Sequence, residues 1–287
     1  MTAVLKRELA SYFNSMTGYV FAAFTIFITG IYIMIYCFKN GYPYFEYVVK
    51  SIEFFYLITI PVLTMRAVAE EKRQKTDQLL YALPLSMTQI VIGKYLAMAI
   101  VLLVPVAELL IMPVILSNYG NVVMATSYSS IFAYYLLGLA LAAIGLFISS
   151  LTENQLVAAV ITFVAALVCY LMTGLATYIP TDAVGSYISF AVIILLIGIA
   201  VWFLTKNKYA AGGILIVAEA ALFILYLFSK TSFEGLLHKV LNKISLFAIT
   251  DNFIYGIFDL TAVVYFITVI FLFIFLAIQS MEKRRWS

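Results

Sequence analysis

Long apolar runs separated by short polar segments dominate this chain of 287 residues. Runs of 18 or more apolar residues predict membrane-spanning helices, and continuous instead of alternating apolarity favours helices over barrel strands. The sequence therefore predicts an all-α integral membrane protein in a single domain over residues 1–287. About eight transmembrane helices are expected, at residues 18–38, 51–69, 91–116, 128–150, 156–179, 187–205, 210–228 and 260–280.

The composition excludes a soluble fold. The chain is 65% hydrophobic and only 11% charged, whereas soluble domains carry about 25% charged residues. With the N-terminus inside and eight spans, 12 of the 17 Lys and Arg residues fall on the inner side, as the positive-inside rule requires. We therefore expect a multi-pass protein of the cell membrane, a bacterial plasma membrane, with cytoplasmic N- and C-termini. Six spans remain the alternative if one apolar pair does not cross.

Residues 2–14 have the pattern of an amphipathic helix lying on the cytoplasmic membrane surface. An alternative is a basic N-terminal anchor without a mechanical role. The predicted apolar side holds Leu5, Leu9, Tyr12 and Phe13, and the predicted polar side holds Lys6, Arg7, Glu8 and Ser11.

Residues 229–259 predict two further elements outside the spans. Apolar positions over residues 232–244 recur at helical spacing, which indicates an amphipathic helix on the outer leaflet. Residues 245–259 are apolar but too short to cross the bilayer and carry interrupting polar residues. They predict a short re-entrant segment, with an ordinary capping loop as the alternative.

The longest charged stretch lies in the polar loop 67–90, AVAEEKRQKTDQLLYALPLSMTQI. A helix is predicted over Thr76–Leu83, because the residue before Pro84 resists helical geometry. Ser86 can then cap the next helix, with Gln89 at the third position of a capping box. An apolar edge suited to a groove on a partner protein is formed by Leu79, Leu80 and Leu83. A solvated loop that only supplies positive charge is the alternative.

This loop resembles the coupling segment of type-2 ABC transporter permeases over EEKRQKTDQLLYALPLSMTQIVIGKYL. LKRELASYFNSMTGYVF resembles the family's connecting helix and first span, and the last 44 or so residues resemble its outer segment and last span, particularly in the branch of gliding-motility-associated permeases. Lys75 stands where the family usually has glycine, which predicts a more regular helix there. Residues 187–228 exceed the six-span core of the family and predict an inserted hairpin.

The resemblance implies the permease subunit of an ATP-driven ABC transporter, an exporter, that is not itself an enzyme. The implied partners are cytoplasmic ABC ATPase subunits, a second permease subunit (as a homo- or heterodimer) and membrane lipid, with no nucleic acid. No phosphate-binding G-x-x-x-x-G-K-[ST] loop occurs in the sequence, so ATP and Mg are expected in the partner ATPase and no cofactor in this chain. The implied ATPase-coupling residues are Glu70, Glu71, Thr76, Leu79, Leu80, Pro84 and Ser86.

Glu108 lies deep in the third predicted span and is a candidate residue for the translocation path, since a buried acid in lipid is costly unless it is protonated or paired. A neutral hydrogen bond between helices is the alternative. The single histidine, His238, predicts no metal site.

Three other functional classes compete with the permease. A secondary transporter or channel not driven by ATP would usually show internal repeats, which are not evident here. A membrane-embedded enzyme would need clustered reactive side chains within the spans. A subunit that relays ATPase movement to an accessory protein is closest to the permease hypothesis.

Overall fold

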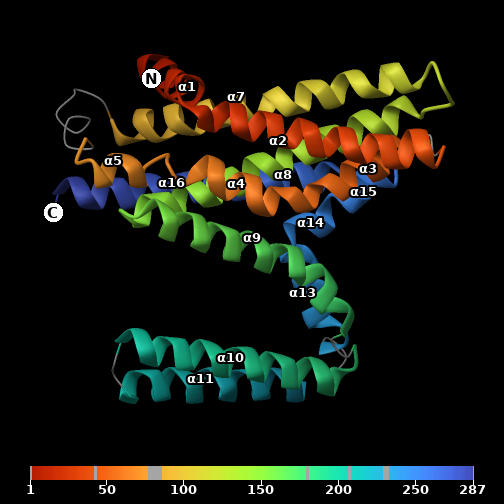
Figure 1. Cartoon of the computed structure of the whole chain (residues 1–287). Helices are drawn as coiled ribbons and strands as arrows, with labels where there is room; N and C mark the ends of the chain where they lie inside the picture. Colours follow the sequence, from red (N-terminus) through yellow and green to blue (C-terminus); the bar gives the residue numbers. More distant parts are fainter. Residues whose placement is uncertain are drawn as a thin grey trace. The chain divides into compact units, whose positions relative to one another are not determined.

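The structure is a computed structural model that describes residues 2–41, 44–76, 86–178, 181–205, 208–228 and 233–286. These residues fold into helices joined by short turns, without a strand among them (Figure 1). The predicted all-α fold class is confirmed. Contacts divide the chain into two compact units: residues 1–168 with 249–287, and residues 169–248. The expected single domain over 1–287 stays a prediction.

Six stretches of the described chain are long and apolar enough to cross a membrane. They lie within the first unit, apart from the end of the fifth, and their bounds are Met16–Lys39, Phe45–Arg73, Met87–Leu116, Met124–Leu151, Gln155–Met172 and Leu260–Arg284. Their helices are α2 (Met16–Ile33) with the π-helix Met34–Lys39, α3 (Phe45–Ile52), the 3₁₀ turn Glu53–Phe55, α4 (Tyr56–Thr64), α5 (Ala69–Arg73), α7 (Met87–Leu116), α8 (Met124–Leu151), α9 (Gln155–Tyr178) and α16 (Leu260–Trp286).

The second span begins earlier than residue 51. Helix α3 starts at Phe45, and its apolar residues Val48, Val49 and Ile52 follow helical spacing and are fully buried. The charged residues of this helix lower its mean hydropathy, so hydropathy alone did not predict it. Lys50 forms ion pairs with Glu53 at 2.9 Å and with Asp251 of α15 (Asp251–Ile254) at 2.6 Å.

Helix α8 forms the centre of the first unit and packs against α3, α4, α7 and α16. The rings of Tyr56 and Tyr134 stack with their centroids 4.3 Å apart. Gly138 and Gly145 let α4 approach closely, because a Cβ atom at either position would meet a side chain of α4 at less than 3 Å.

The second unit contains α10 (Ala183–Thr205), α11 (Lys208–Phe228) and α13 (Leu236–Ile244). Residues 187–205 lie within α10 and 210–228 lie within α11, so each apolar run of the predicted hairpin is helical; whether they span the membrane stays a prediction. Helix α13 confirms the amphipathic pattern, since Leu237 and Leu241 are buried against Met172 and Phe190.

The predicted re-entrant stretch 245–259 consists of two short helices, α14 (Leu246–Ile249) and α15. In the first unit, Ser129 of α8 donates a hydrogen bond to the Phe253 carbonyl at 3.1 Å, and Phe253 packs against Ala133 and Ala262. Helix α15 is therefore held by α8 and α3. Its entry into the bilayer stays a prediction.

Candidate functional site

A fully buried lysine organises the polar end of the first unit, where α1 (Thr2–Asn14) and α5 meet α7 and α8. The side chain of Lys94 in α7 is only 1% exposed. Its Nζ lies 3.0 Å from Oε1 of Glu8 and 2.8 Å from Oε2 of Glu71, and it donates a hydrogen bond to the carbonyl of Ala67 at 2.7 Å. Three oxygens, one from α1 and two from the segment 67–71, thus surround the ammonium group.

Arg7 supplies a second positive charge to this group. Its guanidinium lies 2.5 Å from Oε1 of Glu8 and also forms an ion pair with Glu71. Two bases therefore face two acids, and we call these four residues, Arg7, Glu8, Glu71 and Lys94, the Lys94 cluster. A buried charge is tolerated only when it is paired and hydrogen-bonded, so the cluster fixes α1 to α5 and α7.

Helix α1 lies with Val4, Glu8 and Tyr12 buried. The helix was correctly predicted over residues 2–14, but the assignment of Glu8 to its solvated polar side was wrong. The carboxylate turns into the bundle because Lys94 is buried there. Gly93 lets α1 approach α7, since a Cβ atom at this position would lie 3.0 Å from Cγ1 of Val4.

Burial raises the pKa of Glu8, but the charge of Lys94 and the hydrogen bonds from Arg7 and Lys94 outweigh it, so the pKa lies below its usual range. Glu8 is therefore ionised at neutral pH. Its ion pairs stabilise the fold above the unfolded-state pKa of about 4.3. This contribution is lost as the pH falls through the lower pKa of the folded state.

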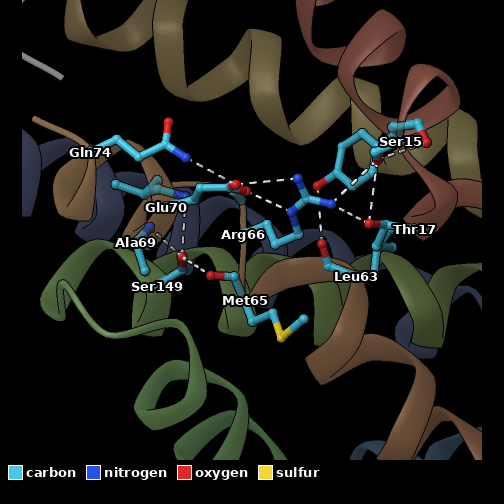
Figure 2. Close-up of polar contacts among 12 residues, drawn as sticks. Ser15, Thr17, Leu63, Met65, Arg66, Ala69, Glu70, Gln74 and Ser149 are labelled. Carbon is cyan, nitrogen blue, oxygen red and sulfur yellow. Dashed lines mark hydrogen bonds and ion pairs between the residues drawn. The ribbon is translucent and has the colours of Figure 1, made fainter. Parts of the chain in front are cut away.

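Arg66 forms a second junction beside the first (Figure 2). Its guanidinium lies between Glu70 and the turn that joins α1 to α2. Nε lies 2.6 Å from Oε2 of Glu70, and the group also donates hydrogen bonds to Thr17 and, at 3.3 Å, to Ser15. Gln74 donates to the other Glu70 oxygen at 3.3 Å. Both predicted coupling acids, Glu70 and Glu71, thus bind bases that hold the N-terminal segment.

Helix α5 is tied to α8 by hydrogen bonds at both of its ends. The Ser149 hydroxyl accepts hydrogen bonds from the backbone N–H groups of Val68 and Ala69, each at 3.1 Å (Figure 2). These are donors that the first turn of a helix leaves unpaired. Lys72 donates to the carbonyl of Ser150. A displacement of α5 must therefore carry α8 with it or break these bonds.

The remaining predicted coupling residues lie on either side of residues 77–85. The Thr76 N–H donates to the Glu71 carbonyl at 3.0 Å and closes the end of α5. Ser86 caps α7 by accepting a hydrogen bond from the Gln89 N–H at 3.3 Å, as predicted. Leu79, Leu80, Pro84 and most of the helix predicted over 76–83 lie outside the described residues.

Lys75 corrects one expectation. A more regular helix was predicted because lysine replaces the usual glycine, but α5 ends at Arg73 and Lys75 has a φ of 58°. Lys75 thus adopts the left-handed conformation that glycine favours, which is strained by about 1–2 kcal/mol for a lysine. The turn is held by the hydrogen bonds that close α5, which offset this cost.

Glu108 is not part of this site. It lies 14 residues beyond Lys94 in α7, which corresponds to about 21 Å along a helix. Its side chain is half-buried, and its Oε2 atom is buried without a hydrogen-bond partner among the described residues. The structure therefore separates the candidate path residue from the coupling residues. The role of Glu108 stays a prediction.

Glu8, Lys94 and Ser149 were not predicted as members of the site. A signal was present for Lys94, because an ionisable residue within an apolar span is commonly paired with another charge. The partner acid could not be identified from spacing, since Glu8 lies 86 positions away in the chain. The assembled group contains charges paired with one another and is suited to holding helices together.

A family model described as ABC-2 family transporter protein matches residues 6–281, a range that includes the whole Lys94 cluster and all of the second unit. No curated protein matches the chain.

Proposed function

The chain belongs to the ABC-2 transporter family, and we propose that it is the permease subunit of an exporter driven by a separate ATPase. Proteins of this family are membrane transport components that work with an ABC ATPase subunit and are not themselves the ATPase. ATP and Mg would be bound by that partner. We further propose a dimer with a second permease subunit, and cytoplasmic N- and C-termini in the cell membrane.

The observation that carries the proposal is the double attachment of the segment 67–76. Lys94 and Arg7 hold Glu71, while Ser149 and Lys72 join α5 to α8. An ATPase that binds the adjoining loop could therefore move α1, α7 and α8 together. A loop that served only to supply positive charge would need none of these buried bonds. The sidedness of Lys and Arg supports placing this segment in the cytoplasm.

The proposal predicts which side of the membrane each end of the first unit faces. Ser86 is exposed beside the loop, and Ile257 is 60% exposed near the opposite end of α16. With Cys37 and Cys169 replaced by alanine, Ser86→Cys should react with a membrane-impermeant maleimide only in inside-out vesicles. Ile257→Cys should react only in right-side-out vesicles.

Removal of peripheral proteins with urea provides the second half of this test. If an ATPase covers the loop, washing should accelerate labelling of Ser86→Cys and leave the Ile257→Cys rate unchanged, because only the loop lies under the partner. Labelling of Ser86→Cys from the outside would contradict the orientation. Equal rates before and after washing, in membranes shown to contain the ATPase, would contradict the proposed docking.

A further inference from the structure

A long groove between α7 and α16 lies on the membrane-spanning surface of the first unit, and no residue of the Lys94 cluster lines it. It encloses about 620 Å³, within the range of small-molecule binding sites. The α7 wall is formed by Thr88, Ile92, Tyr95 and Leu96, and the α16 wall by Ile267, Ile270, Phe271, Ile274, Phe275, Ile278, Gln279 and Glu282. The groove joins two helices that pack directly against each other.

Polar groups occur at only one end of this groove. Thr88 follows the first residue of α7, while Gln279 and Glu282 lie in the last two turns of α16. The other lining residues are apolar or aromatic, and the Tyr95 hydroxyl is already bonded to the carbonyl of Leu139 at 3.2 Å. The lining therefore matches an amphiphile with a polar head beside Glu282 and an apolar tail along α16.

The length of the groove matches one leaflet of a bilayer. Its α16 wall runs from Ile267 to Glu282, which is about 23 Å at 1.5 Å per residue. Half of a bilayer with its headgroups measures about 20–22 Å. A helix from a second copy would cross both leaflets, whereas this groove ends at Ile267, seven residues after the start of α16. The length thus favours a lipid over a neighbouring helix.

The polar end favours a headgroup that carries an ammonium group. Glu282 is half-buried, and no ion pair joins it to another residue of the described chain. Gln279 and Thr88 beside it add hydrogen-bonding groups but no charge. The groove therefore offers a carboxylate where a lipid headgroup would lie, and a primary ammonium group complements it.

We propose that this groove binds an amine-bearing phospholipid, such as phosphatidylethanolamine, from the leaflet at the α5 end of the bundle. The acyl chain lies along Ile270, Ile274 and Ile278, and the ammonium group binds Glu282. The site does not depend on ATP-driven transport, so it can be correct even if the proposed exporter function is not.

Native mass spectrometry of the full chain, titrated with phosphatidylethanolamine or phosphatidylglycerol, tests this site. The intact chain should retain phosphatidylethanolamine about tenfold better, the difference expected for one charge-assisted contact. Glu282→Gln should remove this preference. Ile274→Trp, which fills the groove, should weaken binding of phosphatidylethanolamine about tenfold. Leu272→Trp is the matched control on the same helix, because Leu272 is 50% exposed and does not line the groove.

Equal retention of the two lipids by the intact chain would overturn the headgroup assignment. Identical behaviour of Ile274→Trp and Leu272→Trp would overturn the groove as the binding place. A loss of dimer in Ile274→Trp without a change in lipid binding would show that a second copy covers the groove instead. Thermal unfolding of each variant verifies that it is folded.

Discussion

Replacement of Lys94 by methionine is expected to lower the free energy of unfolding in detergent by about 3–5 kcal/mol, the usual cost of removing one partner of a buried ion pair. Methionine has a similar volume, so packing is largely kept. Glu8 and Glu71 would then face each other with only Arg7 between them. Because α1 loses its bond to α7, we also expect transport to be lost. Denaturant unfolding and transport by reconstituted protein measure the two effects.

Lys239→Met is the matched control, because Lys239 is exposed on α13 of the other unit. It should change stability by less than about 0.5 kcal/mol. Adding Glu8→Gln to Lys94→Met should recover part of the loss, since one uncompensated charge is removed. Glu8→Gln alone should also flatten the acid limb of the stability profile, given that the pKa of Glu8 is lowered in the folded state. A Lys94→Met protein as stable as Lys239→Met would contradict the role of the cluster.

Gly145→Ala should destabilise the contact between α4 and α8. A Cβ atom at this position would lie 2.7 Å from Cβ and 2.8 Å from Cγ2 of Thr64, which is itself fully buried. These are rigid parts of a short side chain, so the helices must separate. Overpacking of this kind costs about 1–3 kcal/mol, and the altered helix spacing should also impair transport. Denaturant unfolding and transport are the measurements.

Gly30→Ala controls for the effect of alanine on helix stability. Gly30 lies within α2, and a Cβ atom there would meet nothing within 4 Å. Alanine should therefore stabilise this helix by up to about 1 kcal/mol. The two substitutions are therefore expected to change the free energy of unfolding in opposite directions. If Gly145→Ala were as stable as Gly30→Ala, the stability of the fold would not depend on the close approach of α4 and α8.

Hydropathy and helical spacing predicted the elements of this fold, because a segment that spans lipid must form its backbone hydrogen bonds within itself. The all-α class, helix α1 and the Ser86 cap on α7 follow from such local signals. The early start of the second span at Phe45 did not, since Glu46, Lys50 and Glu53 lower the local hydropathy. Lys50 forms ion pairs with Glu53 and with the distant Asp251, and no local pattern reveals these contacts.

The coupling residues were identified only in part for a similar reason. Glu70 and Glu71 stand in a charged loop, and the family resemblance draws attention to them. Glu8 was placed on the solvated side of its helix, because a charged residue is usually exposed. Its burial depends on Lys94 in a distant helix. Pairing between charges far apart in the sequence requires the fold, so the junction could not be assembled from one sequence.

Co-purification from detergent tests the proposed ATPase partnership most directly. The intact chain, Leu80→Asp in the predicted coupling loop and Ile257→Asp near the other end of α16 would be isolated from native membranes and their partners identified by mass spectrometry. An ABC ATPase bound to the intact chain and to Ile257→Asp, but lost from Leu80→Asp, is the predicted result. Absence of an ATPase from all three samples would contradict the driven permease and favour a transporter or channel that does not use ATP.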